Sequence, residues 1–227
     1  MTDVERAHAI GRVVVPAGVP DGFRVFYTTI DFEGTVDERI RDFVRPATPA
    51  SCHQVHGIAV RQVESGGEPP RSEVVCDALW SDRKNVALVI KVADCLPVSL
   101  IDPSRHAIAN IHSGWRGAVQ NIVAATLDAA PLDPATSFAF LGPSIRVCCF
   151  EVGEEVASQF DPRFVDRTRG SKPHVDIPAF TLDVLRRRGV SEERMIDPEL
   201  CTRCEGSVFH SYRRDKRSGR NLAIVCS

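Results

Sequence analysis

The sequence predicts an α+β fold, a mixed α/β arrangement, in a single domain spanning residues 1–227. Short apolar runs rich in Val and Ile recur between turn residues, which is typical of buried strands. Helical spacing of apolar residues is confined to a few segments that do not alternate regularly with the strands. A chain of 227 residues with 43% hydrophobic content is long enough for one sizeable core, and no repeat or linker divides it.

Six segments are predicted to form strands because they are short, apolar and rich in β-branched residues. They are residues 24–30, 58–63, 86–92, 98–101, 107–111 and 221–225. Several of these runs have no polar alternation, so we expect both of their faces to be buried.

Three helices are predicted, the first over residues 118–130, where Val119, Ile122, Val123 and Leu127 share one face. The second covers residues 153–160. The third runs from residue 177 or 178 to 188, and Gly189 is expected to close it as a C-terminal cap.

Composition excludes several classes of partner. The formal charge is −2, from 28 Lys and Arg against 30 Asp and Glu, which gives no electrostatic basis for binding nucleic acid. No apolar run is long enough to span a bilayer, and residues 1–6 lack the pattern of a secretory signal, so we expect no membrane association and a cytoplasmic location. The eight cysteines are dispersed, as in a reduced intracellular protein.

Reactive residues gather where predicted strands end, in residues 54–57 (QVHG), 93–97 (ADCLP) and 112–117 (HSGWRG). Two imidazoles and a thiolate, from His56, Cys95 and His112, form a suitable zinc set that leaves a fourth coordination position for catalysis. Cys95 is therefore a candidate catalytic residue as well as a ligand. The alternative is that both histidines cap strands by hydrogen bonding.

Two charged neighbours are further catalytic candidates. Asp94 would orient a ligand histidine or handle protons, or else only hydrogen bond within a turn. Arg116 precedes Gly117 at the expected start of a helix and would bind phosphate, or else form a surface ion pair. Trp115 is expected to be a packing residue rather than a platform for an aromatic ring.

The remaining cysteines favour a structural role. Cys148 and Cys149 are adjacent, which we expect to prevent both from binding one tetrahedral metal, and Cys201 with Cys204 has the spacing of a metal or redox pair. A structural zinc on all four is an alternative, but buried thiols are the expectation. Arg213 and Arg214 would bind a phosphate or carboxylate, or else form a solvated face with Asp215.

Together the motifs resemble the laccase-domain purine nucleoside phosphorylase family, also called polyphenol oxidase, multi-copper oxidase or peptidoglycan editing factor. The resemblance is strongest over residues 52–227. It is carried, in order, by the three segments above and by residues 142–145 (GPSI), 149–153 (CFEVG), 201–204 (CTRC) and 209–215 (FHSYRRD).

The resemblance implies mixed sheets sandwiched by helices, in a fold like that of the cytotoxic-necrotizing-factor cysteine hydrolases. It implies zinc held by His56, Cys95 and His112, with copper as the alternative metal. It also implies phosphorolysis of adenosine, inosine, guanosine and methylthioadenosine, with adenosine deamination as a second activity. The partners would then be a purine nucleoside and phosphate, and the chain would be a monomer or a homodimer.

One segment departs from the family. The usual Phe-Ser-Thr-Arg-x-Gly-Gly stretch near the N-terminus has as its nearest equivalent residues 26–30 (FYTTI), without Arg or a Gly pair. We expect the metal to survive this change but substrate choice to be altered. The alternatives are a cysteine or zinc amidase that edits a peptidoglycan precursor, a copper-dependent phenol oxidase, and a non-catalytic metal-binding protein.

Overall fold

The computed structural model describes residues 7–10, 13–32, 36–65 and 74–227. Within these ranges the strands form two six-stranded sheets and one two-stranded ribbon. The first sheet has the order β1 (Ala7–Ile10), β2 (Val13–Pro16), β3 (Arg24–Thr28), β14 (Asn221–Cys226), β7 (Val86–Val92), β4 (Thr48–Ser51). The second has the order β13 (Met195–Ile196), β10 (Phe138–Leu141), β8 (Leu96–Asp102), β9 (Ala107–Ser113), β6 (Ala78–Ser81), β5 (Val60–Gln62), and β11 (Val165–Asp166) pairs with β12 (His174–Val175).

Both sheets are mixed, as predicted. In the first sheet β4 runs parallel to β7, whereas β14 is antiparallel to both β3 and β7. In the second sheet the β5–β6 and β10–β13 pairs are parallel and the others are antiparallel. All six predicted strands exist, and β7 has the predicted bounds, because its run of β-branched and aliphatic residues is buried on both faces.

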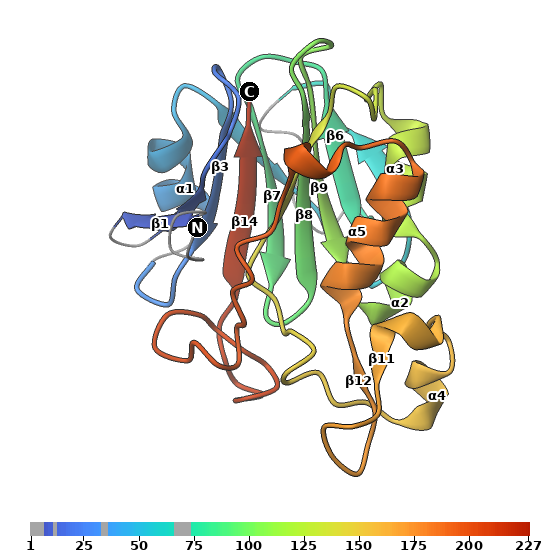
Figure 1. Ribbon diagram of the computed structural model, residues 1–227. Helices are drawn as coiled ribbons and strands as arrows, with labels where there is room; N and C mark the ends of the chain where they lie inside the picture. Colours follow the sequence, from blue (N-terminus) through green and yellow to red (C-terminus); the bar gives the residue numbers. More distant parts are fainter. Residues whose placement is uncertain (1–6, 11–12, 33–35, 66–73) are drawn as a thin grey trace.

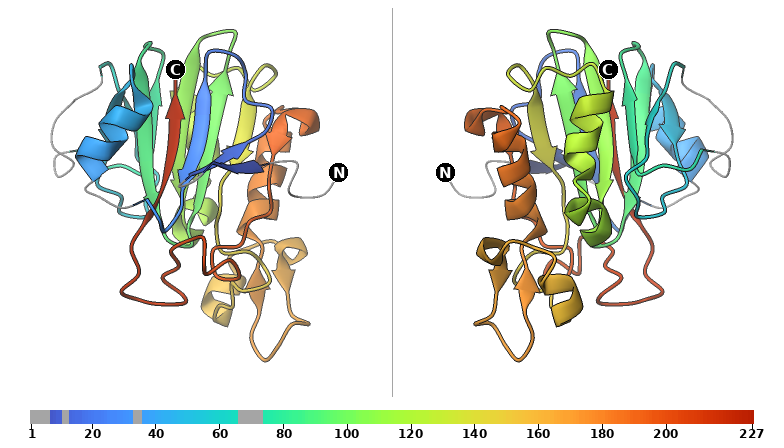
Figure 2. Two further views of the ribbon diagram at one scale, coloured as in Figure 1. Left: turned by 90° about the vertical axis from the view of Figure 1, so that its left-hand side faces the viewer. Right: turned by 90° about the vertical axis from the view of Figure 1, so that its right-hand side faces the viewer.

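Helices cover the outer faces of the two sheets (Figures 1 and 2). One helix, α1 (Val36–Val44), packs on the first sheet, and α2 (Trp115–Val119), α3 (Ile122–Ala129) and α5 (Ile177–Arg187) pack on the second. A shorter helix, α4 (Glu154–Ala157), and the 3₁₀ turns Pro162–Phe164 and Glu192–Arg194 complete the helical elements described. The expectation of mixed sheets sandwiched by helices is therefore confirmed, and no described helix is both long and apolar enough to cross a membrane.

The helix predictions are confirmed in part. The single helix expected over residues 118–130 is wrong, because Asn121 adopts a left-handed conformation with φ of 61° and separates α2 from α3. The helix expected over residues 153–160 is limited to the four residues of α4. The third prediction agrees with α5, which Asp176 caps through the backbone N–H of Ala179 and which ends before Gly189, at φ of 98°.

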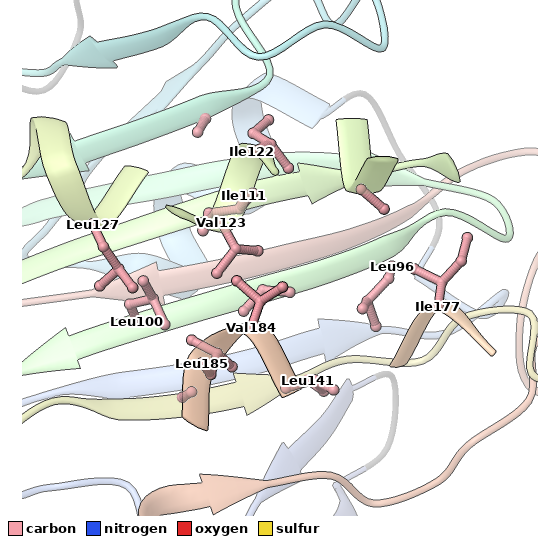
Figure 3. Close-up of a cluster of buried hydrophobic side chains, with 14 of the residues drawn as sticks. Leu96, Leu100, Ile111, Ile122, Val123, Leu127, Leu141, Ile177, Val184 and Leu185 are labelled. Atoms are coloured by element: carbon pink, nitrogen blue, oxygen red, sulfur yellow. The ribbon is translucent and has the colours of Figure 1, made fainter. Parts of the chain in front are cut away.

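The core has an inner layer between the sheets and an outer layer beneath each set of helices. Along β7, Leu88 and Ile90 point toward the second sheet, and Ala87 and Val89 point toward α1. Figure 3 shows the outer layer of the second sheet, where side chains of β8, β9 and β10 meet those of α3 and α5. Each fully buried Leu or Ile contributes about 1.5–3 kcal/mol, so these layers hold the strand ends in fixed positions.

A buried polar contact fixes the two sheets relative to one another. The Asn110 side chain in β9 donates hydrogen bonds to the carbonyl oxygens of Leu88 (2.8 Å) and Ala223 (2.9 Å) in the first sheet. Its side-chain oxygen accepts a hydrogen bond from Ser99 at 3.2 Å. Because an unpaired buried amide costs free energy, this arrangement specifies one relative position of the sheets. That position places the ends of β7 and β9 together at the lower edge of the sheets in Figure 1, and β4, which runs parallel to β7, ends on the same side.

Candidate metal centre

The three predicted metal ligands meet at this end of the sandwich. His56 follows β4, Cys95 lies in the turn between β7 and β8, and His112 belongs to the end of β9. One donor atom from each lies within 4.8 Å of the other two. The imidazole rings of His56 and His112 are 4.8 Å apart between centroids, at 72° to one another. Two nitrogen donors and one sulfur donor fit Zn²⁺ and leave one coordination position open.

The loop that carries His56 is held by two side chains. Gln54 donates to the carbonyl oxygen of Lys91 at 2.8 Å and accepts from its backbone N–H at 2.9 Å, which continues the pairing of β4 with β7. The backbone then turns sharply, with His56 at φ of 61°. This conformation is uncommon for a residue with a Cβ, and so the loop needs hydrogen bonds from other parts of the chain to hold it.

Asp77, directly before β6, supports both histidines and was not anticipated from the sequence. Its buried carboxylate accepts hydrogen bonds from the backbone N–H groups of Val55 (3.2 Å), His56 (2.9 Å) and Gly57 (2.7 Å). It also accepts from Nδ1 of His112 at 2.7 Å, which leaves Nε2 of that ring as the donor atom for a metal. Burial opposes ionisation of Asp77, but these hydrogen bonds, led by that of His112, lower its pKa.

The surroundings of Cys95 favour the thiolate. Burial disfavours the charged form, but hydrogen bonds and positive charge from His112 and His56 outweigh it and lower the pKa of Cys95 to about 6. Burial likewise lowers the pKa of His112, but the hydrogen bonds with Asp77 and Cys95 outweigh it and raise that pKa to about 9. The thiolate is the form of cysteine that binds metals and that acts as a nucleophile.

Gly114 allows the ligands to approach closely. A Cβ atom at this position would lie 3.0 Å from Cδ2 of His56 and 3.1 Å from Sγ of Cys95. These distances are shorter than ordinary van der Waals contacts, so any larger residue would push two ligands outward. Close packing around the donor set thus explains why residue 114 is a glycine.

A cavity of about 770 Å³ opens over the three ligands. This volume is in the range that holds small organic ligands. Three cationic side chains line it, Lys91, Arg213 and Arg220, together with the aromatic rings of Phe150 and Tyr212. The sequence does not indicate that Lys91 and Arg220 reach one cavity, because the elements that bring them there are far apart in the chain.

Asp94 lies on the cavity wall and joins it to the C-terminal loops. Its carboxylate accepts hydrogen bonds from the Thr202 hydroxyl and from the backbone N–H of Arg213, both at 2.6 Å. Its carbonyl oxygen accepts from the backbone N–H of Ile145. The carboxylate that orients a ligand histidine is instead Asp77.

Arg116 is exposed and its guanidinium stacks on Trp115, 4.4 Å from the ring centroid. It does not occur among the described residues that line the cavity. Trp115 packs against the core under the helices, as expected. Of the two arginines in the 209–215 segment, Arg213 faces the cavity, while Arg214 donates to the carbonyl oxygens of Thr202 and Phe209.

The structure corrects the expectations for the four clustered cysteines. Cys149 and Cys201 are buried, but Cys148 and Cys204 are exposed, so burial does not explain all four. The side chains of the adjacent Cys148 and Cys149 do not point apart, as the expectation required. The sulfur atoms of all four cysteines lie within 4.8 Å of one another. None of the eight cysteines, all of which lie within the described residues, forms a disulfide.

Fold and site together define a two-sheet sandwich with three potential metal ligands gathered at one end. The sequence profile of the multi-copper polyphenol oxidoreductase laccase family matches residues 27–227, and the chain belongs to this family. The purine nucleoside phosphorylase YfiH of Escherichia coli is 33% identical over 187 residues, which cover 79% of this chain and 74% of the relative. The adenosine deaminase RL5, from an unknown prokaryotic organism, is 30% identical over 217 residues, which cover 90% of this chain and 82% of the relative.

Solved structures show the same fold. The crystal structure of YlmD from Geobacillus stearothermophilus superposes with a TM-score of 0.85 at 22% identity and covers 98% of each chain. The YfiH protein of Bacillus licheniformis gives a TM-score of 0.85 at 20% identity, covering 97% of this chain and 98% of the other. The mixed-sheet architecture is therefore that of these proteins.

Proposed function

We propose that this chain is a zinc-dependent purine nucleoside phosphorylase whose metal is held by His56, Cys95 and His112. The observation that carries the proposal is the convergence of these three donor atoms, within 4.8 Å of one another, beneath a cavity lined by cations and aromatic rings. The names of the relatives support it, because they describe enzymes that act on purine nucleosides.

A zinc ion held there would polarise an oxygen atom at its open coordination position. The protein supplies the positioning. Asp77 holds the proton on Nδ1 of His112 and fixes the ring, so that Nε2 keeps its direction without rearrangement. We prefer zinc to copper for two reasons, both drawn from the described residues. A copper oxidase needs many more imidazole ligands than the two that converge here, and the axial methionine typical of a copper site with two histidines and one cysteine is not in this group, since Met195 belongs to β13.

We assign phosphate binding to Lys91, Arg213 and Arg220. Their charges face one cavity, and the guanidinium of Arg213 is anchored by donating to the carbonyl oxygen of Glu151 at 2.8 Å. Its remaining N–H groups are available for a bidentate contact with phosphate oxygens. A phosphate oxygen held here would attack C1′ of the nucleoside while the glycosidic bond breaks, and the base would leave with the bonding electrons. Arg116 is not among the described residues that line the cavity, so we do not assign phosphate binding to it.

Phe150 and Tyr212 are the proposed contacts for the base, since flat apolar rings stack on purines. The substrates we expect are adenosine, inosine, guanosine and methylthioadenosine, with deamination of adenosine as a second activity. The altered segment at residues 26–30 overlaps the end of β3, where Tyr27 is fully buried in the inner core. Counted from Phe26, the family's arginine falls at Thr29, which is buried and carries no charge.

The second candidate is a cysteine amidase. Sγ of Cys95, the ring of His112 and the carboxylate of Asp77 form a continuous hydrogen-bonded series, which is the arrangement of a nucleophile, a base and its orienting group. The pKa of Cys95, near 6, suits a nucleophilic thiolate. A thiolate that is bound to zinc is a poor nucleophile, so the two candidates respond in opposite ways to zinc.

The test is a chromatographic assay of adenosine and inosine with zinc-loaded protein, with and without phosphate. We expect base release that requires phosphate, is lost on removal of zinc and returns when zinc is restored. Base release without phosphate would indicate a hydrolase. Amide hydrolysis that persists or increases after zinc removal would establish the amidase instead.

Gly114→Ala tests the tight packing of the metal site. The added Cβ lies within 3.1 Å of atoms of two ligands, and overpacking of this kind costs about 1–3 kcal/mol. We expect zinc affinity to fall roughly 10- to 100-fold, measured by competition with a chromogenic chelator. Gly170→Ala is the matched control, since nothing lies within 4 Å of its added Cβ, and its affinity should equal that of the wild type. Equal affinity in both variants would contradict the proposed donor set.

A further inference from the structure

Four thiols converge on one point beside the wall of the cavity. Sγ of Cys148 lies 3.7 Å from that of Cys149, 3.6 Å from that of Cys201 and 3.7 Å from that of Cys204. The sulfurs of Cys149 and Cys204 are 3.4 Å apart. None of these cysteines forms a disulfide. They make up a group separate from the donor set of His56, Cys95 and His112.

The backbone brings the two pairs together from distant parts of the chain. Ser144 forms a parallel bridge with Cys201, through hydrogen bonds of 3.2 Å to the carbonyl oxygen of Leu200 and 3.0 Å from the N–H of Thr202. Each pair then lies in a turn. The N–H of Cys149 bonds to the carbonyl oxygen of Arg146, and the carbonyl oxygen of Cys201 accepts from the N–H of Glu205. The first turn allows adjacent cysteines to direct their sulfurs to the same point.

The spacing of the sulfurs fits a single tetrahedral ion. With Zn–S bonds of about 2.3 Å, the sulfurs of a four-thiolate site stand about 3.8 Å apart, close to the distances observed here. An iron–sulfur cluster would hold them farther apart, because each thiolate ligates a different iron atom. Four thiolate donors leave no position for substrate, which is the pattern of a structural zinc site.

The surroundings suit an ion with four anionic ligands. The Arg203 guanidinium hydrogen bonds to Cys149, and the backbone N–H groups of Arg146, Arg203 and Cys204 are directed at the sulfur of Cys201. Such N–H contacts support metal thiolates. Cys148 and Cys204 are exposed, which provides a path for the ion to enter, while Cys149 and Cys201 are buried beneath it.

We propose that Cys148, Cys149, Cys201 and Cys204 form a second, structural zinc site. It joins two loops that build the cavity wall. The first carries Ile145 and Phe150, and the second carries Thr202, whose hydroxyl bonds to Asp94 next to the ligand Cys95. The site is independent of the proposed catalytic reaction, and its role is to hold this wall in place.

Metal analysis of the full chain, purified and reconstituted with zinc under reducing conditions, tests the proposal. We expect two zinc ions per chain in the wild type and one in Cys204→Ser, where an exposed ligand is replaced by an isosteric residue. Cys95→Ser should also keep one, and the double variant should keep none. Cys226→Ala, which removes a buried thiol of β14 outside both donor sets, is the control and should keep two.

A second measurement starts from the wild type, whose spectrum reports the ligand set directly. Titration of the metal-free wild type with Co²⁺ should give the visible spectrum of a tetrahedral tetrathiolate site, and this spectrum should be absent from Cys148→Ser but present in Cys95→Ser. One zinc per chain that Cys95→Ser alone removes would overturn the second site while leaving the catalytic one intact. Two disulfides among the four cysteines of the native protein would overturn it as well.

Discussion

Cys95→Ser is expected to remove the catalytic metal and with it the phosphorolytic activity. A serine hydroxyl does not ionise near neutral pH and cannot replace the thiolate that the two histidines favour at this position. Loss of metal assistance costs several kcal/mol of transition-state stabilisation, so kcat/KM for inosine should fall roughly 1000-fold or more. Steady-state phosphorolysis and zinc content, measured on the same preparation, check both parts of the prediction.

The control is Cys226→Ser, which makes the same chemical change in a buried strand away from the cavity and should retain activity. Because a nucleophilic Cys95 would also be lost in Cys95→Ser, alkylation separates the two candidates. Zinc-loaded wild type should resist modification of Cys95 by iodoacetamide, and zinc-free protein should react rapidly. Rapid alkylation with zinc bound would argue against the metal ligand and for the amidase.

Asp77→Asn is expected to weaken zinc binding without removing any ligand. The amide keeps one oxygen but places an NH₂ group against N–H donors of the 55–57 loop or of His112, so that about half of the hydrogen bonds are lost. Loss of such a supporting carboxylate lowers metal affinity by roughly 10- to 100-fold. The unsatisfied buried donors should also lower the free energy of unfolding by about 3 kcal/mol. Chelator competition and chemical denaturation measure the two effects.

A matched variant separates positioning from general stability. Asp102 in β8 is also a fully buried carboxylate and accepts hydrogen bonds from Ser104, Asp133 and Thr136. Asp102→Asn should therefore destabilise the protein while zinc affinity stays at the wild-type value. If both variants lose stability but neither loses affinity, Asp77 is a structural residue rather than one that positions His112.

Much of the sheet architecture and the donor set are predictable from the sequence, because the relevant information is local. The continuous apolar run of β7 is visible by inspection, and the proposed ligands stand at strand ends within two residues of a glycine or proline. The break between α2 and α3 is not visible, since the apolar spacing continues through Asn121 and neither Gly nor Pro marks it. Only the tertiary structure places that residue in a left-handed conformation.

The unpredicted parts of the site are those that depend on pairing across the sheets. Asp77 directly precedes β6, a strand that was not predicted, and its importance arises from the loop at residues 55–57 that packs over it. Lys91 belongs to β7 and Arg220 precedes β14, and only their antiparallel pairing brings both toward one cavity. The two cysteine pairs are likewise distant in the chain, with a separation of 53 positions from Cys148 to Cys201. A single β-bridge between Ser144 and Cys201 brings them together.

The ligands of the triad come from three strand ends in two different sheets, and this has a consequence for the order of assembly. The β8–β9 hairpin alone can bring Cys95 beside His112, but all three cannot meet until β4 has paired with β7 and the two sheets have packed. A metal ion bound by all three therefore cannot template the early stages of folding, whose rate is governed by these long-range pairings. Its binding energy would act on the finished molecule, slowing the unfolding reaction while leaving the folding rate nearly unchanged.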